Sequence, residues 1–313
     1  MKDTKSLNTI LAGLFIAAAF STTAICDEAT AKVSREKLVE PVFRVTKQET
    51  ATTTAQASLV KPTGVPLVKK PHPLDGALVM ANAALNRSQT EVTDYTAILV
   101  KRERIDGVLN DESYMTTKIR NEKRDAAGNV TVPFGVYLKF LKPSSVKGRE
   151  VIYVAGENNG KLIAHEGGFK GKFTPSLYLD PNGTLAMMGQ RYPIYDAGIE
   201  NLCKKLIARG QRDRAVGMCQ VNITEAVINQ RTAKRIEVVH PQRKKGLDFH
   251  IARIFVDDEY QLPVRYEAYD WPARANGKVT QDDLIEEYTY IRLKFNVGLT
   301  DKDFDPENPK YNM

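Results

Sequence analysis

The chain of 313 residues is long enough for one large domain or two small ones, and 42% of its residues are hydrophobic. Its net charge of +7 lies mostly near the start, because ten basic and six acidic residues precede Leu74 and leave the remainder at only +3. That remainder contains no arginine-rich helix and no aromatic-basic recognition motif, so we expect no nucleic-acid partner.

The first 24 residues have the pattern of a secretory signal peptide. Lys2 and Lys5 precede an apolar run over 10–20 that is too short to span a bilayer. The small residues at 22–24 predict cleavage after Ala24. No later segment is apolar enough to cross a membrane. We therefore expect an exported protein of the periplasm or cell envelope, with no transmembrane segment in the mature chain.

Residues 25–73 are predicted to be a disordered linker. The segment is rich in Thr, Ala, Lys and Pro and has no sustained hydrophobic period, so it cannot bury enough surface to offset its ordering entropy. Cys26 would tether the mature chain to a membrane if it were lipidated. Ile25 argues against this, since the lipidation signal requires Gly, Ala or Ser at that position. The folded domain is expected over 74–313.

A helix followed by a series of strands is predicted at the start of this domain. Asp75 is a favourable N-cap, and Leu78, Ala81 and Leu85 recur at helical spacing, which predicts a helix over about 75–88. The chain then changes to β-prone segments separated by turn signals. These predicted strands cover 95–105, 113–122, 133–143, 149–156, 161–167 and 176–180.

A second helix is predicted over about 195–209. Ile199, Cys203 and Ile207 are among five apolar residues that share one helical face, and Gly210 is expected to end the helix. Because the strands arrive as hairpins rather than as βαβ units, a parallel nucleotide-binding sheet is disfavoured. The remaining β-prone segments cover 220–227, 235–240, 248–257, 262–269 and 287–295.

This pattern predicts an α+β fold built on one large, curled antiparallel sheet of roughly nine or ten strands with two main helices. Two helices of about 14 residues reach only about 21 Å each, so they cannot cover such a sheet unless it curls around them. An open half-barrel with the helices as a lid would leave an apolar cavity, the usual form of a site for a hydrophobic ligand.

The segment VIYVAGENNGKLIAHEGG, residues 151–168, has some likeness to a phosphate-binding loop. That motif requires Gly where Ala155 stands, Ser or Thr after Lys161, and a helix where this sequence is β-prone. Asn159 and Gly160 instead form the strongest short hairpin signal, because both tolerate positive φ. We therefore expect a β-hairpin here. The apolar residues expected to share one face of its sheet are Ile152, Val154, Leu162 and Ala164.

No catalytic or metal-binding motif is found in the sequence. The four histidines lack the spacing of a metal site, and no serine or cysteine lies in a nucleophile motif. The segment 301–305 is better explained as a capped helical turn than as a calcium loop, since Pro306 stands where that loop needs Gly. We expect no metal, no cofactor and no enzymatic activity. An unrecognised hydrolase, with carboxylates brought together by folding, is the alternative.

Cys203 and Cys219 are predicted to form a disulfide, because a pair of cysteines in an exported chain is commonly oxidised. Two separately buried thiols are the alternative. Arg191 and Tyr192 precede the second predicted helix, and Trp271 lies at a strand end. Side chains in such places would contact a ligand at the mouth of a cavity, with core packing as the alternative.

Several segments resemble a family of exported bacterial proteins, the domain of unknown function numbered 1571. They are FLKPSSVKGREVIYVAGENNGKLIAH, MGQRYPIYDAGIENL, LPVRYEAYDWP and NVGLTDKDFDPENPKYNM, in that order, within residues 75–313. The resemblance supplies no established catalytic residues. The family looks akin to the LolA/LolB-like carriers, and this kinship implies a half-barrel whose apolar cavity holds lipids or the acyl chains of lipoproteins.

The sequence thus predicts a non-enzymatic envelope protein that binds a hydrophobic or acylated ligand, either a lipid or a lipoprotein, in the cavity of a half-barrel. The alternative is an envelope interaction or sensor module that uses the same fold to recognise a protein partner. An open cavity and a co-purifying lipid would favour the carrier, whereas a barrel filled with side chains would favour the interaction module.

Overall fold

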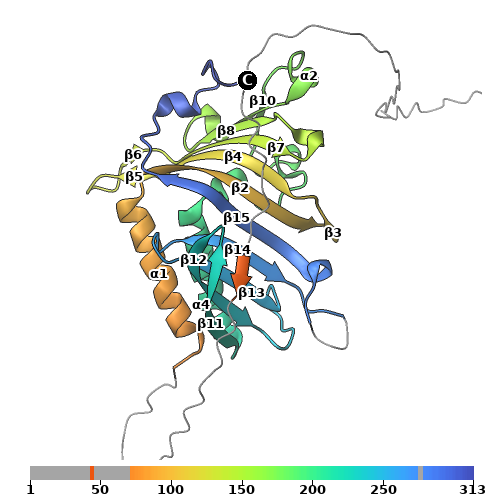
Figure 1. Cartoon of the computed structure of the whole chain (residues 1–313). Helices are drawn as coiled ribbons and strands as arrows, with labels where there is room; N and C mark the ends of the chain where they lie inside the picture. The colour runs from red at the N-terminus through yellow and green to blue at the C-terminus, as the bar shows by residue number, and fades with distance from the viewer. Residues whose placement is uncertain (1–42, 46–70, 274–277) are drawn as a thin grey trace, which may run out of the picture. The chain divides into compact units, whose positions relative to one another are not determined.

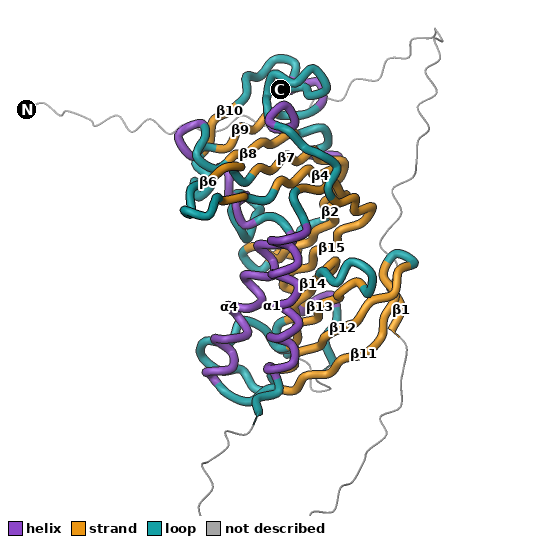
Figure 2. The backbone as a smooth tube through the Cα atoms, turned by 90° about the vertical axis from the view of Figure 1, so that its left-hand side faces the viewer, coloured by secondary structure: helices purple, strands orange, loops and turns teal. Residues whose placement is uncertain are grey.

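The computed structural model describes residues 43–45, 71–273 and 278–313. The predicted signal peptide, Cys26 and most of the predicted linker lie outside the described residues. In the described part, one large antiparallel sheet carries two long helices that pack together (Figures 1 and 2). This arrangement confirms the predicted α+β class with its large antiparallel sheet and two main helices.

The sheet contains 13 strands. Their bounds are β1 Phe43–Val45, β2 Asp94–Ile105, β3 Val108–Leu109, β4 Ser113–Arg120, β7 Gly135–Lys142, β8 Glu150–Val154, β9 Leu162–His165, β10 Leu177–Leu179, β11 Gln220–Ile228, β12 Arg231–Val239, β13 Ile251–Asp257, β14 Pro263–Tyr269 and β15 Leu284–Phe295. A separate hairpin consists of β5 Lys123–Arg124 and β6 Val130–Val132. The helices and helical turns are α1 Leu74–Glu91, η1 Ser144–Val146, η2 Asn158–Gly160, α2 Gly168–Gly171, α3 Thr184–Met187, η3 Ile194–Asp196, α4 Ile199–Val216, η4 Gln281–Asp283 and η5 Asp301–Phe304.

Two meanders make up the sheet and meet at its centre. Strands β11 to β15 follow one another in space, then β2, β4, β7, β8, β9 and β10, with β15 pairing antiparallel to β2. At the far edge, Phe43–Val45 pairs with β11 although the sequence assigned these residues to the linker. Three residues are too few to show an alternating pattern, which is why this short edge strand gave no signal.

The two long helices are each longer than their predicted ranges. Helix α1 begins after Pro73, with Asp75 in its first turn rather than at the N-cap. Gly210 does not end the second helix, which continues to Val216. A Cβ atom at Gly210 would lie 2.9 Å from Leu78 Cδ2, so the glycine allows α1 and α4 to approach each other closely. The predicted turn near the C-terminus is confirmed as η5, which carries a capping box.

The predicted disulfide is wrong, because Cys203 and Cys219 are free and buried in the structure. Cys203 lies in the second turn of α4, whereas Cys219 follows the end of that helix. The 13 residues from Cys203 to Val216 rise about 20 Å along the axis, and the chain from Val216 to Cys219 is too short to bring the second Cα back within the roughly 7 Å that a disulfide allows. The paired-cysteine rule missed this separation because it takes no account of a helix between the two residues.

We expect both thiols to remain reduced and to react slowly in the folded protein. Burial raises the pKa of Cys203 to about 12 and that of Cys219 to about 11, and the thiolate is the reactive form. In a chain carrying Cys26→Ser, thiol titration in denaturant should therefore detect both cysteines without prior reduction, and labelling before unfolding should be slow. Thiols that appear only after reduction would contradict the structure.

Candidate functional site

A cavity of about 530 Å³ lies between one half of the sheet, α4 and the segment 174–198 that leads into α4. Strands β2, β4, β7, β8, β9 and β10 supply its wall, and the side chains that they present there are mostly apolar. Among these are Leu99, Met115, Ile119, Leu138, Phe140, Val151, Leu162 and Leu179. The curled sheet is thus not filled by its own side chains in this half.

The β8–β9 hairpin is confirmed and forms part of the cavity wall. Its turn places Asn158, Asn159 and Gly160 at positive φ, the conformation that these residue types tolerate. The apolar residues do not share one face as expected. Ile152 pairs with Ile163, and this register places Ile152 and Val154 against Phe304 of η5. Leu162 and Ala164 instead line the cavity on the other face of the sheet. The turn signal locates the hairpin but does not set its register, and a shift of one residue exchanges the two faces.

Charged and phenolic side chains form a polar strip at one end of the cavity, where β2, β14, β15 and α4 meet. Glu286 is 1% exposed and lies at its centre. The Tyr192 hydroxyl donates to Glu286 Oε1 at 3.2 Å, and Arg191 Nε lies 3.2 Å from Glu286 Oε2. Arg209 Nη1 approaches the same carboxylate at 3.5 Å. The members of the polar strip are Lys101, Glu103, Arg191, Tyr192, Arg209, Tyr266, Glu286 and Tyr288.

The second carboxylate of the polar strip is Glu103. Lys101 Nζ donates to Glu103 Oε2 at 2.8 Å, and the Tyr288 hydroxyl donates to Glu103 Oε1. Glu103 and Glu286 are opposite one another across the β2–β15 pair. Each carboxylate therefore has its own cation, and a network of hydrogen bonds connects the two.

Burial governs the ionisation of the polar strip. It raises the pKa of Tyr192 and of Tyr266, and the charge of Glu286 raises both further, so these phenols remain neutral donors. Burial alone would lower the pKa of Arg209, but Tyr266 and Glu286 beside it raise that pKa above its usual value. The strip consequently offers fixed charges and neutral hydroxyl groups next to an apolar wall.

The structure brings together two of the three predicted site residues. Tyr192 lines the cavity, and Arg191 reaches it through Glu286. Trp271 does not line this cavity: its Nε1 donates to the backbone oxygen of His240 at 2.9 Å, and Arg243 stacks 4.7 Å from its ring centroid. The alternative of structural packing therefore applies to Trp271.

Sequence reasoning missed the central members of the polar strip, although a signal was present. Arg209 falls on the apolar face of α4, three residues after Leu206. Glu286 lies on the same face of β15 as Tyr288 and Tyr290, and all three side chains line the cavity. A charged residue in the apolar register of a helix or strand is a departure that indicates a functional or buried polar group.

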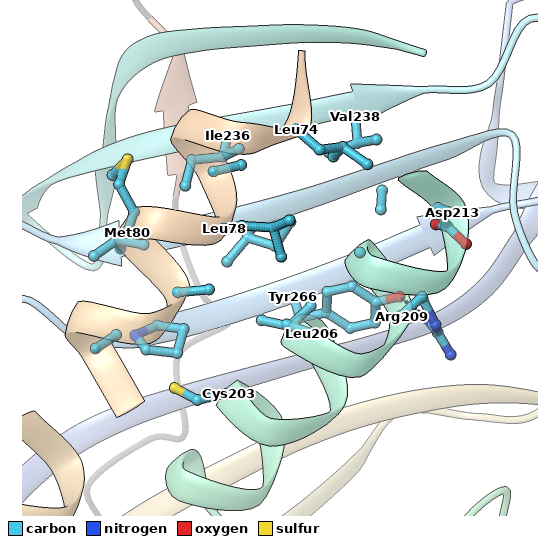
Figure 3. Close-up of a pocket in the computed structure, with 18 of the residues that line it drawn as sticks. Leu74, Leu78, Met80, Cys203, Leu206, Arg209, Asp213, Ile236, Val238 and Tyr266 are labelled. Atoms are coloured by element: carbon cyan, nitrogen blue, oxygen red, sulfur yellow. Dashed lines mark hydrogen bonds between the residues drawn. The ribbon is translucent and has the colours of Figure 1, made fainter. Parts of the chain in front are cut away.

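A second, smaller cavity of about 70 Å³ lies between α1, α4 and strands β12 to β14. Figure 3 shows Leu78 of α1 between the sheet and Leu206 of α4, with Tyr266 and Arg209 close by. Leu206, Arg209 and Tyr266 line both cavities. Asp213 lies at one end of the smaller cavity, where its Oδ2 is 3.8 Å from His240 Nε2.

Two further observations concern the residues that the structure describes. Among them, no three His, Cys, Asp or Glu side chains are grouped in a way that could hold a metal ion. Within the same ranges, no helix has both the length and the apolar character needed to cross a bilayer.

The family comparison covers most of the folded chain. Residues 92–313 match the model of the family described as protein of unknown function (DUF1571). The chain belongs to this family. None of the curated proteins matches it.

Several solved structures are similar to this family member at low identity. A putative outer membrane lipoprotein-sorting protein domain from Vibrio parahaemolyticus shares 13% identity, with a TM-score of 0.34, over 73% of this chain and 95% of that one. The LolA superfamily protein NE2245 from Nitrosomonas europaea shares 10% identity, with a TM-score of 0.29, over 73% of this chain and 97% of that one. The Mycobacterium tuberculosis lipoprotein LppX gives 12% identity and a TM-score of 0.38, over 74% of this chain and 100% of that one.

Proposed function

We propose that this protein binds a hydrophobic or acylated ligand, either a lipid or the acyl chains of a lipoprotein, without converting it chemically. The observation that carries the proposal is the cavity of about 530 Å³ with its mainly apolar wall. Small-molecule sites commonly have volumes of about 300–1,000 Å³. Transfer of acyl methylenes from water to such a wall contributes about 0.8 kcal/mol each, which is sufficient to drive binding.

The polar strip would hold the polar end of the ligand. The charged side chains that line the cavity are four cations and four carboxylates: Lys101, Arg149, Lys205, Arg209, Glu103, Glu166, Asp196 and Glu286. Because the cations of the strip are already paired with Glu103 and Glu286, a charged head group bound there would lie beside a charge of its own sign. Ester or hydroxyl groups, which accept from Arg209 and exchange hydrogen bonds with Tyr192, fit the strip better.

The hydrolase alternative is less well supported by this site. Glu103 and Glu286 are close, as a glycosidase pair would be, but a glycosidase requires one carboxyl group that holds a proton. Both carboxylates here lie beside cations: Lys101 pairs with Glu103, and Arg191 pairs with Glu286. These ion pairs hold both side chains in place, which suits a positioning role.

We further propose that the protein acts after export, in the periplasm or cell envelope. The proposal rests on the signal-peptide pattern of residues 1–24 and on the linker composition of 25–73. The domain from residue 74 onwards would then carry the binding activity, and Cys26 would decide whether the chain is tethered. N-terminal sequencing and intact mass of the exported protein test the cleavage site and any lipid on Cys26.

Ala164→Phe is expected to weaken ligand binding about tenfold or more, because the ring would occupy space that a few ligand methylenes need. Ala164 lines the cavity from β9. The measurement is extraction and mass spectrometry of lipid that co-purifies with the exported protein, together with displacement of a fluorescent fatty acid. Ala83→Phe, on the exposed side of α1, is the matched control and should bind like the wild type.

Unaltered binding by the Ala164→Phe protein, with unchanged thermal stability, would contradict the proposal that the ligand binds in this cavity. Wild-type protein that is free of lipid and fails to displace the fluorescent fatty acid would favour the alternative, recognition of a protein partner.

A further inference from the structure

We propose that the segment 168–188 is a membrane-docking surface, which we call the rim segment, and that it places the mouth of the cavity against an anionic phospholipid bilayer. The segment connects β9 to the approach to α4 and contains α2, β10 and α3. Figure 1 shows α2 and β10 at the end of the sheet opposite to β11.

The first observation is a concentration of exposed apolar side chains. Thirteen large hydrophobic residues are exposed in the described part of the chain, and six of them fall within these 21 positions, so the distribution is not that of scattered surface residues. Phe169 and Phe173 are the most exposed, at 77% and 74%, and their rings contact each other with centroids 5.1 Å apart. The other four are Leu177, Tyr178, Leu185 and Met188.

The second observation is that the rim segment has two apolar sides. Leu177, Leu185 and Met188 are partly exposed to solvent, yet they also line the cavity. The outer apolar surface is therefore continuous with the inner wall. A bilayer in contact with the outside of this segment would lie next to the interior of the cavity, with no intervening water layer for an acyl chain to cross.

Charge complementarity identifies a bilayer as the occupant. The rim segment begins against the loop before β8, since a Cβ on Gly148 would lie 3.3 Å from the backbone nitrogen of Gly168. Residues 142–149 and 166–188 together carry five basic and two acidic residues. Glu166, one of the two acidic residues, is paired with Arg149 at 2.8 Å. Among the basic residues, Lys147 and Lys172 are exposed to solvent.

Basic residues beside exposed aromatic rings are the composition of surfaces that bind at the interface of an anionic membrane. A second copy of this chain would meet the same surface with its own net positive charge, which disfavours self-association. The helical turn α2 has only four residues, so the rings would enter the head-group region without spanning the bilayer.

The two most exposed rings of the rim segment, Phe169 and Phe173, do not line the cavity, so membrane binding through them does not depend on what the cavity binds. A protein whose cavity takes no lipid would still bind vesicles through the rim segment. Conversely, a protein that binds no vesicles would still take up a dispersed fatty acid. The two proposals therefore fail independently.

Co-sedimentation with lipid vesicles tests the docking surface. The protein is the exported, processed chain with Cys26→Ser, so that neither the signal peptide nor a lipid anchor contributes. We expect binding to vesicles of phosphatidylglycerol and phosphatidylcholine in equal parts, weaker binding in high salt, and much weaker binding to phosphatidylcholine alone. Phe169→Ser with Phe173→Ser should reduce binding at least about tenfold. Val79→Ser with Val108→Ser, which changes two exposed apolar residues outside the rim segment, should leave it unchanged.

A fluorescent probe gives a second measurement that needs no loss of function. Phe173→Trp should show a blue shift of emission when anionic vesicles are added, because the new indole enters the interface. The native Trp271 lies outside the rim segment, so the wild type should show no shift. Wild-type protein that does not bind anionic vesicles, or a Phe169→Ser, Phe173→Ser protein that binds them equally well, would overturn the proposal. So would a protein partner that requires these phenylalanines in the absence of any vesicle effect.

Discussion

Arg265→Met is expected to lower the free energy of unfolding by about 3–5 kcal/mol near neutral pH. Arg265 is 7% exposed in β14, and its guanidinium lies 2.8 Å from Glu267 Oε2 and 2.7 Å from Glu287 Oε2. It also donates to Thr289 Oγ1 at 2.6 Å. Methionine would fill similar space, but Glu287 would lose its ion-pair partner, and Glu267 would keep only Arg253, which lies 3.0 Å from its Oε1. The cost is large because a buried charge without a partner retains its full desolvation penalty.

The loss should shrink as the pH falls. Burial already raises the pKa of Glu287, with Arg265 opposing the effect, so removal of Arg265 leaves a carboxylate that takes up a proton more readily when folded. Chemical denaturation at about pH 7.5 and about pH 5 checks this expectation. Arg87→Met breaks an exposed pair with Glu91 and should change stability by no more than about 0.5 kcal/mol. A similarly small loss for Arg265→Met would show that water reaches this cluster.

Asp213→Asn is expected to stabilise the protein at alkaline pH, by up to about 3 kcal/mol. Asp213 is 1% exposed in α4, and among the described residues its Oδ1 has no hydrogen-bond partner. Burial raises the pKa of this carboxyl from 3.8 to about 6, although Arg212 and Arg209 oppose the rise. Asparagine has nearly the same shape and carries no charge to desolvate.

The sign of this effect depends on pH in a defined way. A raised pKa means that the folded state binds the proton more tightly than the unfolded state, so stability is lost as the pH rises from about 4 through about 6. Asp213→Asn should therefore gain stability at about pH 8 and little or none below about pH 4. Denaturation midpoints across this window are the measurement, and Asp111→Asn at an exposed position is the control. A variant that is less stable than the wild type at about pH 8 would show that the buried charge of Asp213 does not destabilise the folded protein.

Local patterns predicted the elements of this fold well. The spacing of Leu78, Ala81 and Leu85 located α1, and Asn159-Gly160 located the β8–β9 hairpin. Such signals are carried by neighbours in the sequence, and they express backbone preferences that apply before the chain is folded. The coverage argument, that two helices cannot fill a large curled sheet, also anticipated an apolar cavity.

The polar strip could not be predicted in the same way, because its members come from distant parts of the chain. Arg209 of α4 meets Glu286 of β15 only after the two meanders have joined. Gly210 illustrates the same limit, since its role is to let Leu78 of another helix approach and not to end its own. These features depend on tertiary contacts, which override local propensity.

The pairing of β2 with β15 at the centre of the sheet has a consequence for how the chain folds. Tyr95 of β2 pairs with Phe295 of β15, so the first and last long strands of the domain are neighbours. Non-local pairings of this kind slow folding, because the intervening loop entropy must be lost before the contacts form. Neither meander has its inner edge covered until nearly the whole domain is available. Synthesis that halts before β15 should therefore leave two open sheet edges, a form prone to aggregation and suited to capture by a chaperone.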